Sequence, residues 1–525
     1  MIESHAPAHP EGTIRLIPFQ REFWREFRAP SGWVEGVDGT WPPTQLRYFG
    51  EYLAQLECKT ILLETHYIDR DYIYDTATFY SRNLRSYPNY CQRLHFFCET
   101  FDEARWRSLL RDAGHGEMSR SLKFLEEGYL GFSVVRPLPG SPIGRTVLPT
   151  LGPKTDVGFV REFHSIRSYV VHLAGFTLSV RGLAFQQQDQ GVSACATTAL
   201  WSSLHYVASK EHLYVPTPAE ITEAAARYSL AGGRSLPQEG LNLQQICEAI
   251  RYFGLSPLIV ESQPIENGVE YDKAQLLGYI ASGFAPLLAI RPVAAFEGTR
   301  RADGHAVCGV GLKVSNQGHQ TNQNFSFQDA ASRIVGLYVH DDRLGPYAFT
   351  KLSQYTVKRT LQIRNVLTTA WPAGQRDEDS VPDEDAVLEA LVVPLPPKVR
   401  LTIARMRALG LALADATGQL MPNLNKKVTL NYRYVLASDY KVAALGFGLT
   451  DEGAYLLNCE TVLSRYLGLL EFAGPNGPLY DVLMDSTETP ANPAAIACVC
   501  RLGLVSKDLE TVHSFARRIG ARFIK

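Results

Sequence analysis

The sequence contains no run of about 18 uncharged apolar residues, which is the length that a membrane-spanning helix requires. Its first residues do not combine a basic segment with an apolar core, so no secretory signal is predicted. Charge of one sign is not in excess either, because 52 Lys and Arg stand against 54 Asp and Glu, a net charge of −2. Whole-protein electrostatics therefore give no reason to expect binding to nucleic acid or to an acidic membrane.

Signals for disulfides and cofactors are also missing. The nine cysteines are an odd number, and most of them lie inside apolar stretches. This usage is typical of reduced thiols rather than of a disulfide framework, and we expect a cytoplasmic protein. No phosphate-binding loop of the Gly-x-x-x-x-Gly-Lys type is present, and no cofactor is predicted.

One group of cysteines and histidines has a spacing that could suit zinc. Cys91, His95 and Cys98 would share one face of a helix, and Cys58 or His66 could complete a site. Buried thiols and a partly exposed histidine on an aromatic helix are the commoner explanation of such a pattern. We therefore predict no metal site.

Composition and length predict a globular protein of about three domains. Apolar residues make up 45% of the chain and charged residues 20%, as in ordinary soluble proteins. Residues 1–160 are rich in aromatic residues and are expected to form a mixed α/β domain of unknown role. An acidic segment with prolines, 371–389, is expected to be an exposed linker or long loop. It separates a central domain, 161–370, from a C-terminal α+β domain, 390–525.

Local patterns in the central domain predict both helices and strands. Thr217, Pro218 and Glu220 form a capping box that marks a helix start, and Gly254 marks the end of another helix. Apolar periodicity predicts helices near 196–208, 246–253 and 272–282, and strands near 169–173, 176–180, 257–260, 286–290, 305–310 and 334–340.

The most informative stretch surrounds Cys195. It places this cysteine between a glycine-containing loop and the start of a helix, with several glutamines just upstream. Unpaired N–H groups and the helix dipole both favour a thiolate at such a junction. A glutamine side-chain amide beside the thiol could donate a hydrogen bond to an oxyanion. Cys195 is therefore a candidate nucleophile.

A thiol nucleophile needs a base, and the base needs an acceptor that holds it in place. His305 stands at the start of a predicted apolar strand, and Asp341 and Asp342 stand at the end of the next one. If these two strands are adjacent and antiparallel, a carboxylate lies beside the imidazole. We favour Asp341 over Asp342 as the acceptor.

The order Cys, His, Asp in these contexts resembles the papain-like cysteine peptidases. The closest branch is the bacterial one that includes the bacteriocin leader peptidases and the phytochelatin synthases. In that branch a glutamine precedes a cysteine that opens a helix, and a "Gly-x-Pro" strand, a "Gly-His" strand and a strand ending in Asn/His-Asp follow. Here 283–286, Gly-Phe-Ala-Pro, approximates the first strand, 304–305 matches the second and 339–341 the third. The resemblance covers about residues 165–355.

The resemblance implies a fold and a role for each matching residue. The fold is α+β: a papain-like domain with a helical half and an antiparallel sheet half, flanked here by the two mixed domains. Cys195 would be the nucleophile, His305 the base, and Asp341 the residue that orients the imidazole. The family glutamine usually lies six residues before the cysteine, where this chain has Asp189, so Gln190 or Gln188 could complete the oxyanion hole. The alternative is an oxyanion hole that uses only main-chain N–H groups, including that of Cys195. The chain also has Ala196 where the family commonly has glycine.

The expected function is the hydrolysis of an amide bond through an acyl-enzyme, as in a cysteine peptidase, isopeptidase or amidase. One alternative is an acyl-transferring enzyme of the transpeptidase or transglutaminase type. Another is an inactive papain-like module that serves as a binding or scaffold protein, which the departures at Asp189 and Ala196 keep open. The expected partner is a peptide or protein substrate, with no nucleic acid and no membrane. Further protein partners could contact the N- and C-terminal domains.

Overall fold

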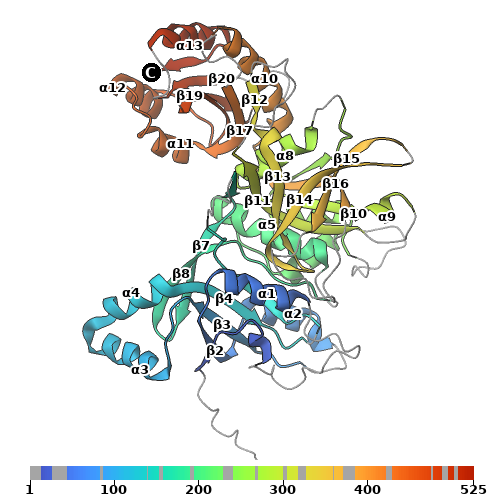
Figure 1. Ribbon diagram of the computed structural model, residues 1–525, viewed down its shortest axis with the longest axis vertical. Helices are drawn as coiled ribbons and strands as arrows, with labels where there is room; N and C mark the ends of the chain where they lie inside the picture. The colour runs from blue at the N-terminus through green and yellow to red at the C-terminus, as the bar shows by residue number, and fades with distance from the viewer. Residues whose placement is uncertain are drawn as a thin grey trace, which may run out of the picture.

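The computed structural model describes residues 14–25, 44–82, 87–138, 140–152, 158–189, 194–228, 240–266, 270–298, 304–316, 327–358, 360–369, 385–420, 428–474, 477–487, 495–501 and 506–525. It shows a mixed α+β protein whose three lobes follow one another along the longest axis (Figure 1). None of the helices in the described part of the chain is long and apolar enough to cross a membrane.

The N-terminal lobe is built on a five-stranded antiparallel sheet in sequential order. Its strands are β1 (Ile14–Pro18), β2 (Thr60–Tyr67), β3 (Cys91–Phe97), β4 (Tyr129–Val135) and β5 (Ile143–Val147). Its helices are α1 (Thr44–Gln55), α2 (Arg70–Thr78), α3 (Glu103–Asp112) and α4 (Met118–Gly128). A hairpin of β7 (Arg167–Leu173) and β8 (Phe176–Gly182) contacts this lobe through α4, β4 and β5, although we assigned it to the central domain.

The helix expected around Cys91 and His95 is wrong, because these residues lie in strand β3. All seven residues of β3 are buried, since the strand is in the middle of the sheet and is covered on both faces. A strand of this kind has no polar alternation, so its apolar run could be mistaken for part of a helix. His95 is fully buried and its two ring nitrogens contact the Tyr129 hydroxyl and the Glu64 carboxylate. It is therefore a satisfied core histidine.

The central lobe contains a closed six-stranded antiparallel barrel. Its strands follow the order β10 (Leu287–Pro292), β11 (His305–Ser315), β13 (Ile334–Asp341), β14 (Gly345–Thr356), β15 (Ile363–Thr369) and β16 (Asp385–Leu395), and β16 pairs back with β10. Strand β9 (Ser256–Glu261) adds to β16, and β6 (Phe159–Phe163) adds to β11.

Helices cover the barrel of the central lobe. They are α5 (Cys195–Glu211), α6 (Pro218–Ala225), α7 (Leu243–Tyr252), α8 (Tyr271–Ala281) and the short α9 (Val293–Phe296). The helix start predicted at Thr217 is confirmed, because its side chain caps the Glu220 N–H and Glu220 returns a bond to the Thr217 N–H. Helix α5 contacts β10, β11, β13 and β16, so the barrel fixes the position of its first turn.

The segment expected to be a linker, 371–389, overlaps a strand in the structure, because β16 begins at Asp385. Residues 370–384 lie outside the described part of the chain, but Asp385 already begins β16, which closes the barrel. The end of the central lobe therefore lies beyond residue 389. An apolar run after the acidic residues, from Ala386 to Leu395, pairs with β10, β15 and β9 and explains the difference.

The C-terminal lobe has a six-stranded sheet. Its order is β12 (Phe327–Asp329), β17 (Val428–Leu436), β18 (Tyr466–Gly474), β19 (Gly477–Asp485), β20 (Ala495–Cys500) and β21 (Arg522–Ile524), with parallel pairing at both edges. Its helices are α10 (Ile403–Leu420), α11 (Ala437–Ala444), α12 (Asp451–Tyr455) and α13 (Ser506–Arg518). Strand β12 belongs to this C-terminal sheet, although in the chain it lies between β11 and β13 of the central barrel. A segment from the middle of the sequence is therefore part of the C-terminal lobe.

The N-terminal lobe packs against the turn that follows β13. Tyr48 on α1 donates its hydroxyl hydrogen to the Pro346 carbonyl, and the ring of Tyr52 stacks on that of Tyr347 with centroids 5.8 Å apart. Gln45 at the start of α1 donates to the main-chain carbonyl of Asp342 at 3.1 Å. The two lobes therefore meet directly beside the end of β13.

Candidate active site

Cys195 is the first residue of α5, as the sequence predicts. Ala194 precedes the helix in an extended conformation and supplies no side-chain cap. The first-turn N–H groups and the positive end of the helix dipole therefore act on the thiol without a competing side-chain acceptor from the cap residue. Cys195 is half-buried, whereas most of the rest of α5 is buried against the lobe.

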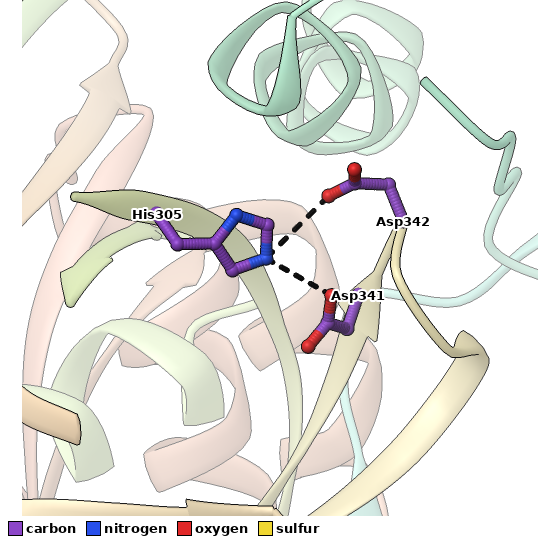
Figure 2. Close-up of side chains that lie close together, drawn as sticks. All are labelled: His305, Asp341 and Asp342. Atoms are coloured by element: carbon purple, nitrogen blue, oxygen red, sulfur yellow. Dashed lines mark hydrogen bonds and ion pairs between the residues drawn. The ribbon is translucent and has the colours of Figure 1, made fainter. Parts of the chain in front are cut away.

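His305 lies at the start of β11, beside the end of β13. Its Nε2 is 3.0 Å from Oδ1 of Asp341 and 3.6 Å from Oδ1 of Asp342 (Figure 2). The antiparallel pairing of β11 with β13 places these residues together, as expected, since Cys308 pairs with His340.

The Cys195 side chain lies close enough to His305 to be one of the causes that raise the pKa of this imidazole. Because the two carboxylates face Nε2, the nitrogen left for the thiol is Nδ1, which Figure 2 shows on the ring edge away from Asp341. The imidazole therefore bridges a thiol on α5 and a carboxylate on β13. The structure brings together the three residues to which the sequence assigned the roles of nucleophile, base and orienting acid.

The surroundings of His305 favour its protonated form. Burial disfavours the charged imidazole, but the negative charges of Asp341 and Asp342 outweigh burial and raise the pKa of His305 to about 10. Burial also tends to raise the pKa of Asp341, but the charge and hydrogen bond of His305 hold that pKa well below its ordinary value. Such mutual stabilisation is expected of an imidazolium–carboxylate pair.

Asp341 and Asp342 have different environments. Asp341 also accepts a hydrogen bond from the Arg343 N–H at 2.9 Å, so its carboxylate is well satisfied. The Oδ2 atom of Asp342 is buried and has no hydrogen-bond partner among the described residues. Burial raises the pKa of Asp342, and the charge of Asp341 adds to this effect. Asp341 is therefore the better-placed anionic partner of His305.

The structure describes only Gln188 of the two glutamines that the sequence predicts as oxyanion donors. Gln190 lies outside the described residues, and Gln188 is half-buried in the segment before Cys195. Gln187 has a structural role, because its side chain accepts from the Ile143 N–H and donates to the Gly140 carbonyl. Gln186, which sequence reasoning did not single out, is 2% exposed, and its amide nitrogen has no partner among the described residues. The assignment of Gln188 or Gln190 as donor stays a prediction.

Asp189, six residues before Cys195, joins the N-terminal lobe to the segment before Cys195. Its carboxylate is 3.6 Å from Nη1 of Arg136, and the side chains of both residues are almost fully buried. Burial and then the charge of Asp189 raise the pKa of the Tyr80 hydroxyl. Arg136 in turn donates to the main-chain carbonyls of Ser141 and Gln187. No local signal could have predicted this contact, because Arg136 and Tyr80 are far from Asp189 in the sequence.

Replacing Arg136 with methionine is expected to lower the free energy of unfolding by about 3–5 kcal/mol, because the change leaves the Asp189 carboxylate buried without its cation. Urea unfolding monitored by intrinsic fluorescence would measure this. Arg107→Met is the control, since Arg107 pairs with Glu103 on an exposed surface and its loss should cost about 0.5 kcal/mol or less. Equal effects of the two substitutions would contradict a stabilising role for the buried pair.

His305, Asp341 and Asp342 also have ligand atoms within 4.8 Å of one another, the only such group among the described residues. Imidazole nitrogen and carboxylate oxygen are ligands that divalent metals accept. A metal on Nε2 would have to replace the hydrogen bond from His305 to Asp341, and the thiol on the other ring nitrogen would stay outside that ligand set.

Chemically, this arrangement can move a proton. An imidazole held between a thiol and a buried carboxylate can take the thiol proton, keep it as an imidazolium, and later give it to a leaving group. Neither the scan against protein-family models nor the search of curated proteins finds a match to this chain.

Proposed function

We propose that this protein is a papain-like cysteine peptidase, or an isopeptidase or amidase that uses the same chemistry. The observation that carries the proposal is the placement of His305 between the Cys195 side chain, which contributes to its raised pKa, and Asp341, to which its Nε2 is hydrogen-bonded. Its support comes from the placement of the thiol at the start of a helix that packs on a closed antiparallel barrel. All nine cysteines are free thiols, which suits a reducing compartment such as the cytoplasm.

In the proposed reaction, His305 holds the proton of the Cys195 thiol while the thiolate sulfur attacks the carbonyl carbon of the scissile amide. The carbonyl oxygen becomes an oxyanion, and the main-chain N–H of Cys195, together with Gln188 or Gln190, donates to it. His305 then gives its proton to the leaving amine as the C–N bond breaks, which leaves a thioester on Cys195. A water molecule gives a proton to His305 as its oxygen attacks the thioester, and the carboxylic acid and the thiolate are released.

Asp341 has a positioning role in this proposal. It holds the ring so that Nδ1 faces the thiol, and its charge stabilises the imidazolium that exists before attack and between the two half-reactions. Arg343 and burial keep this carboxylate in place.

The proposal is tested by incubating the full chain with a pool of peptides of mixed sequence and analysing the products by mass spectrometry. We expect cleavage at defined peptide bonds, loss of cleavage in Cys195→Ala, and no effect of EDTA. Added primary amine separates the two enzyme hypotheses, since a transferase would give amide adducts in place of acids. Absence of both cleavage and transfer, with no thioester trapped on Cys195, would overturn the proposal in favour of a binding protein. Inhibition by EDTA that zinc reverses would instead indicate a metal site.

A further inference from the structure

A cavity remote from Cys195 lies between the N-terminal sheet, the β7–β8 hairpin and helix α5. Its volume is about 540 Å³, which lies within the range of ordinary ligand pockets. Four arginines line it, and no acidic residue is among the described residues of its wall; the arginines are Arg70, Arg93, Arg145 and Arg167. A cavity with this wall favours an anionic ligand.

The carboxylates that pair with these arginines do not line the cavity and do not match them in number. Arg93 pairs with Glu64, Arg145 with Asp69, and Arg70 with Asp71; these are three acids for four cations. The guanidinium of Arg167 instead donates to the main-chain carbonyl of His205 at 2.9 Å. The wall therefore keeps the positive charge of Arg167, which forms no ion pair among the described residues.

An aromatic ring lies against each of the four guanidinium groups, and Arg70 lies over Tyr214 at 5.3 Å from the ring centroid. Arg93 lies over Tyr67 at 4.1 Å from the ring centroid, and Arg167 lies over Tyr169 at 4.4 Å. Arg145 lies over Phe132 at 6.0 Å. A stacked guanidinium loses little further freedom when it binds, and its planar set of donors matches the oxygens of a phosphate.

His205 adds an unsatisfied polar atom to this wall. The residue is 5% exposed, its Nδ1 contacts the Tyr169 hydroxyl at 3.3 Å, and its Nε2 has no hydrogen-bond partner among the described residues. Burial and then the charges of the neighbouring arginines hold the pKa of His205 well below its ordinary value, so the ring is neutral. Buried polar atoms in native proteins nearly always have a partner, which a ligand could provide here.

Apolar side chains form a second part of the wall, which His172 borders. Val170, Val171 and Val215 line the cavity together with the Phe132 ring. An inorganic anion would leave this surface without contact, whereas an organic ring attached to the anion could cover it. The cavity therefore combines a cationic side with an apolar side.

We propose that this cavity binds a phosphate-bearing small molecule of nucleotide size, with its phosphate on the arginines and its ring against the valines. His205 lies ten residues after Cys195 on α5, so the site is about 15 Å from the thiol along the helix axis. The proposal does not depend on the chemistry at Cys195.

The test is isothermal titration calorimetry of the full chain with ATP, pyrophosphate and adenosine at an ionic strength of about 0.15 M. We expect ATP to bind more tightly than pyrophosphate, and adenosine to bind at least about tenfold more weakly than ATP. Equal affinity for ATP and pyrophosphate would overturn the ring contact, and equal affinity for ATP and adenosine would overturn the phosphate contact. Absence of binding of all three probes at millimolar concentration would overturn the proposal as a whole.

Two substitutions with matched controls locate the binding. Arg167→Gln is expected to weaken ATP binding by about 10- to 100-fold, the usual effect of losing a charged hydrogen-bond donor, while Arg181→Gln on the same hairpin should not change it. Val170→Glu adds a repelling carboxylate at a side chain that is 66% exposed, and Val442→Glu does the same at one that is 70% exposed on α11. The first should weaken binding and the second should not. Affinities that match between variant and control would place the ligand elsewhere.

Discussion

Replacing His305 with alanine is expected to lower the turnover of any peptide that the protein cleaves by about 10³-fold or more. General acid–base catalysis by a positioned side chain contributes about 10²–10⁴-fold, and His305 has two such roles in the proposed reaction. It holds the thiol proton before attack and protonates the leaving amine afterwards. The measurement is the initial rate of product formation, followed by mass spectrometry with an isotope-labelled standard.

The matched control for this experiment is His115→Ala. His115 is an exposed histidine of the N-terminal lobe, and its ring is hydrogen-bonded to the main-chain carbonyl of Arg111. Its removal should leave the rate within about twofold of the wild-type rate, because surface substitutions of this kind have small effects. A His305→Ala variant that keeps its fold and loses less than about tenfold in rate would show that this imidazole is not the base.

Asp341→Asn is the second substitution with a large expected effect. We expect it to lower the rate by about 10²–10⁴-fold, because an amide in place of the carboxylate no longer stabilises the imidazolium and favours the wrong ring tautomer. Asp342→Asn should lower the rate by less than about tenfold, since Asp342 is 3.6 Å from Nε2 and Asp341 is 3.0 Å from it. A larger effect at Asp342 than at Asp341 would reverse the assignment of the two carboxylates.

The same substitution has a consequence for the dependence of stability on pH. The charges of the two aspartates overcome burial and raise the pKa of His305 to about 10, above its ordinary value of 6.5. The stability that this pair contributes is thus fully present below pH 6.5 and is lost as the pH rises through 10. Asp341→Asn should therefore destabilise the protein more at pH 6 than at pH 10 in urea unfolding. An equal loss at both values would argue against a charged pair.

Much of the site could be predicted because its signals are local. The helix start at Cys195, the strand that begins at His305 and the strand that ends at Asp341 each follow from a few neighbouring residues. The alternation and turn signals around them also place β11 beside β13, because sequential strands often pair. The three side chains could therefore be assigned to one site before their distances were known.

The parts that could not be predicted depend on contacts between distant segments. Strand β16 follows a run of acidic residues, and that run predicts an exposed linker. The pairing of β16 with β10, which closes the barrel, has no local signal in the sequence. Strand β3 is buried on both faces and lacks the alternation that identifies a strand. The ion pair between Arg136 and Asp189 joins two lobes, and neither residue lies in a local sequence pattern that predicts the other as its partner.

The central claim is that Cys195 and His305 share a proton, and the alkylation rate of each cysteine tests it most directly. Iodoacetamide labelling followed by mass spectrometry from pH 5 to 9 would compare the wild-type chain with His305→Ala. Exposed Cys459 and half-buried Cys98 serve as internal references, while the other six thiols are buried. We predict that Cys195 alone reacts rapidly below pH 7, where an ordinary thiol is only about 3% ionised or less, and that His305→Ala slows it to the rate of the references. A Cys195 that reacts no faster than Cys98 and Cys459, or that is indifferent to His305, would contradict the account.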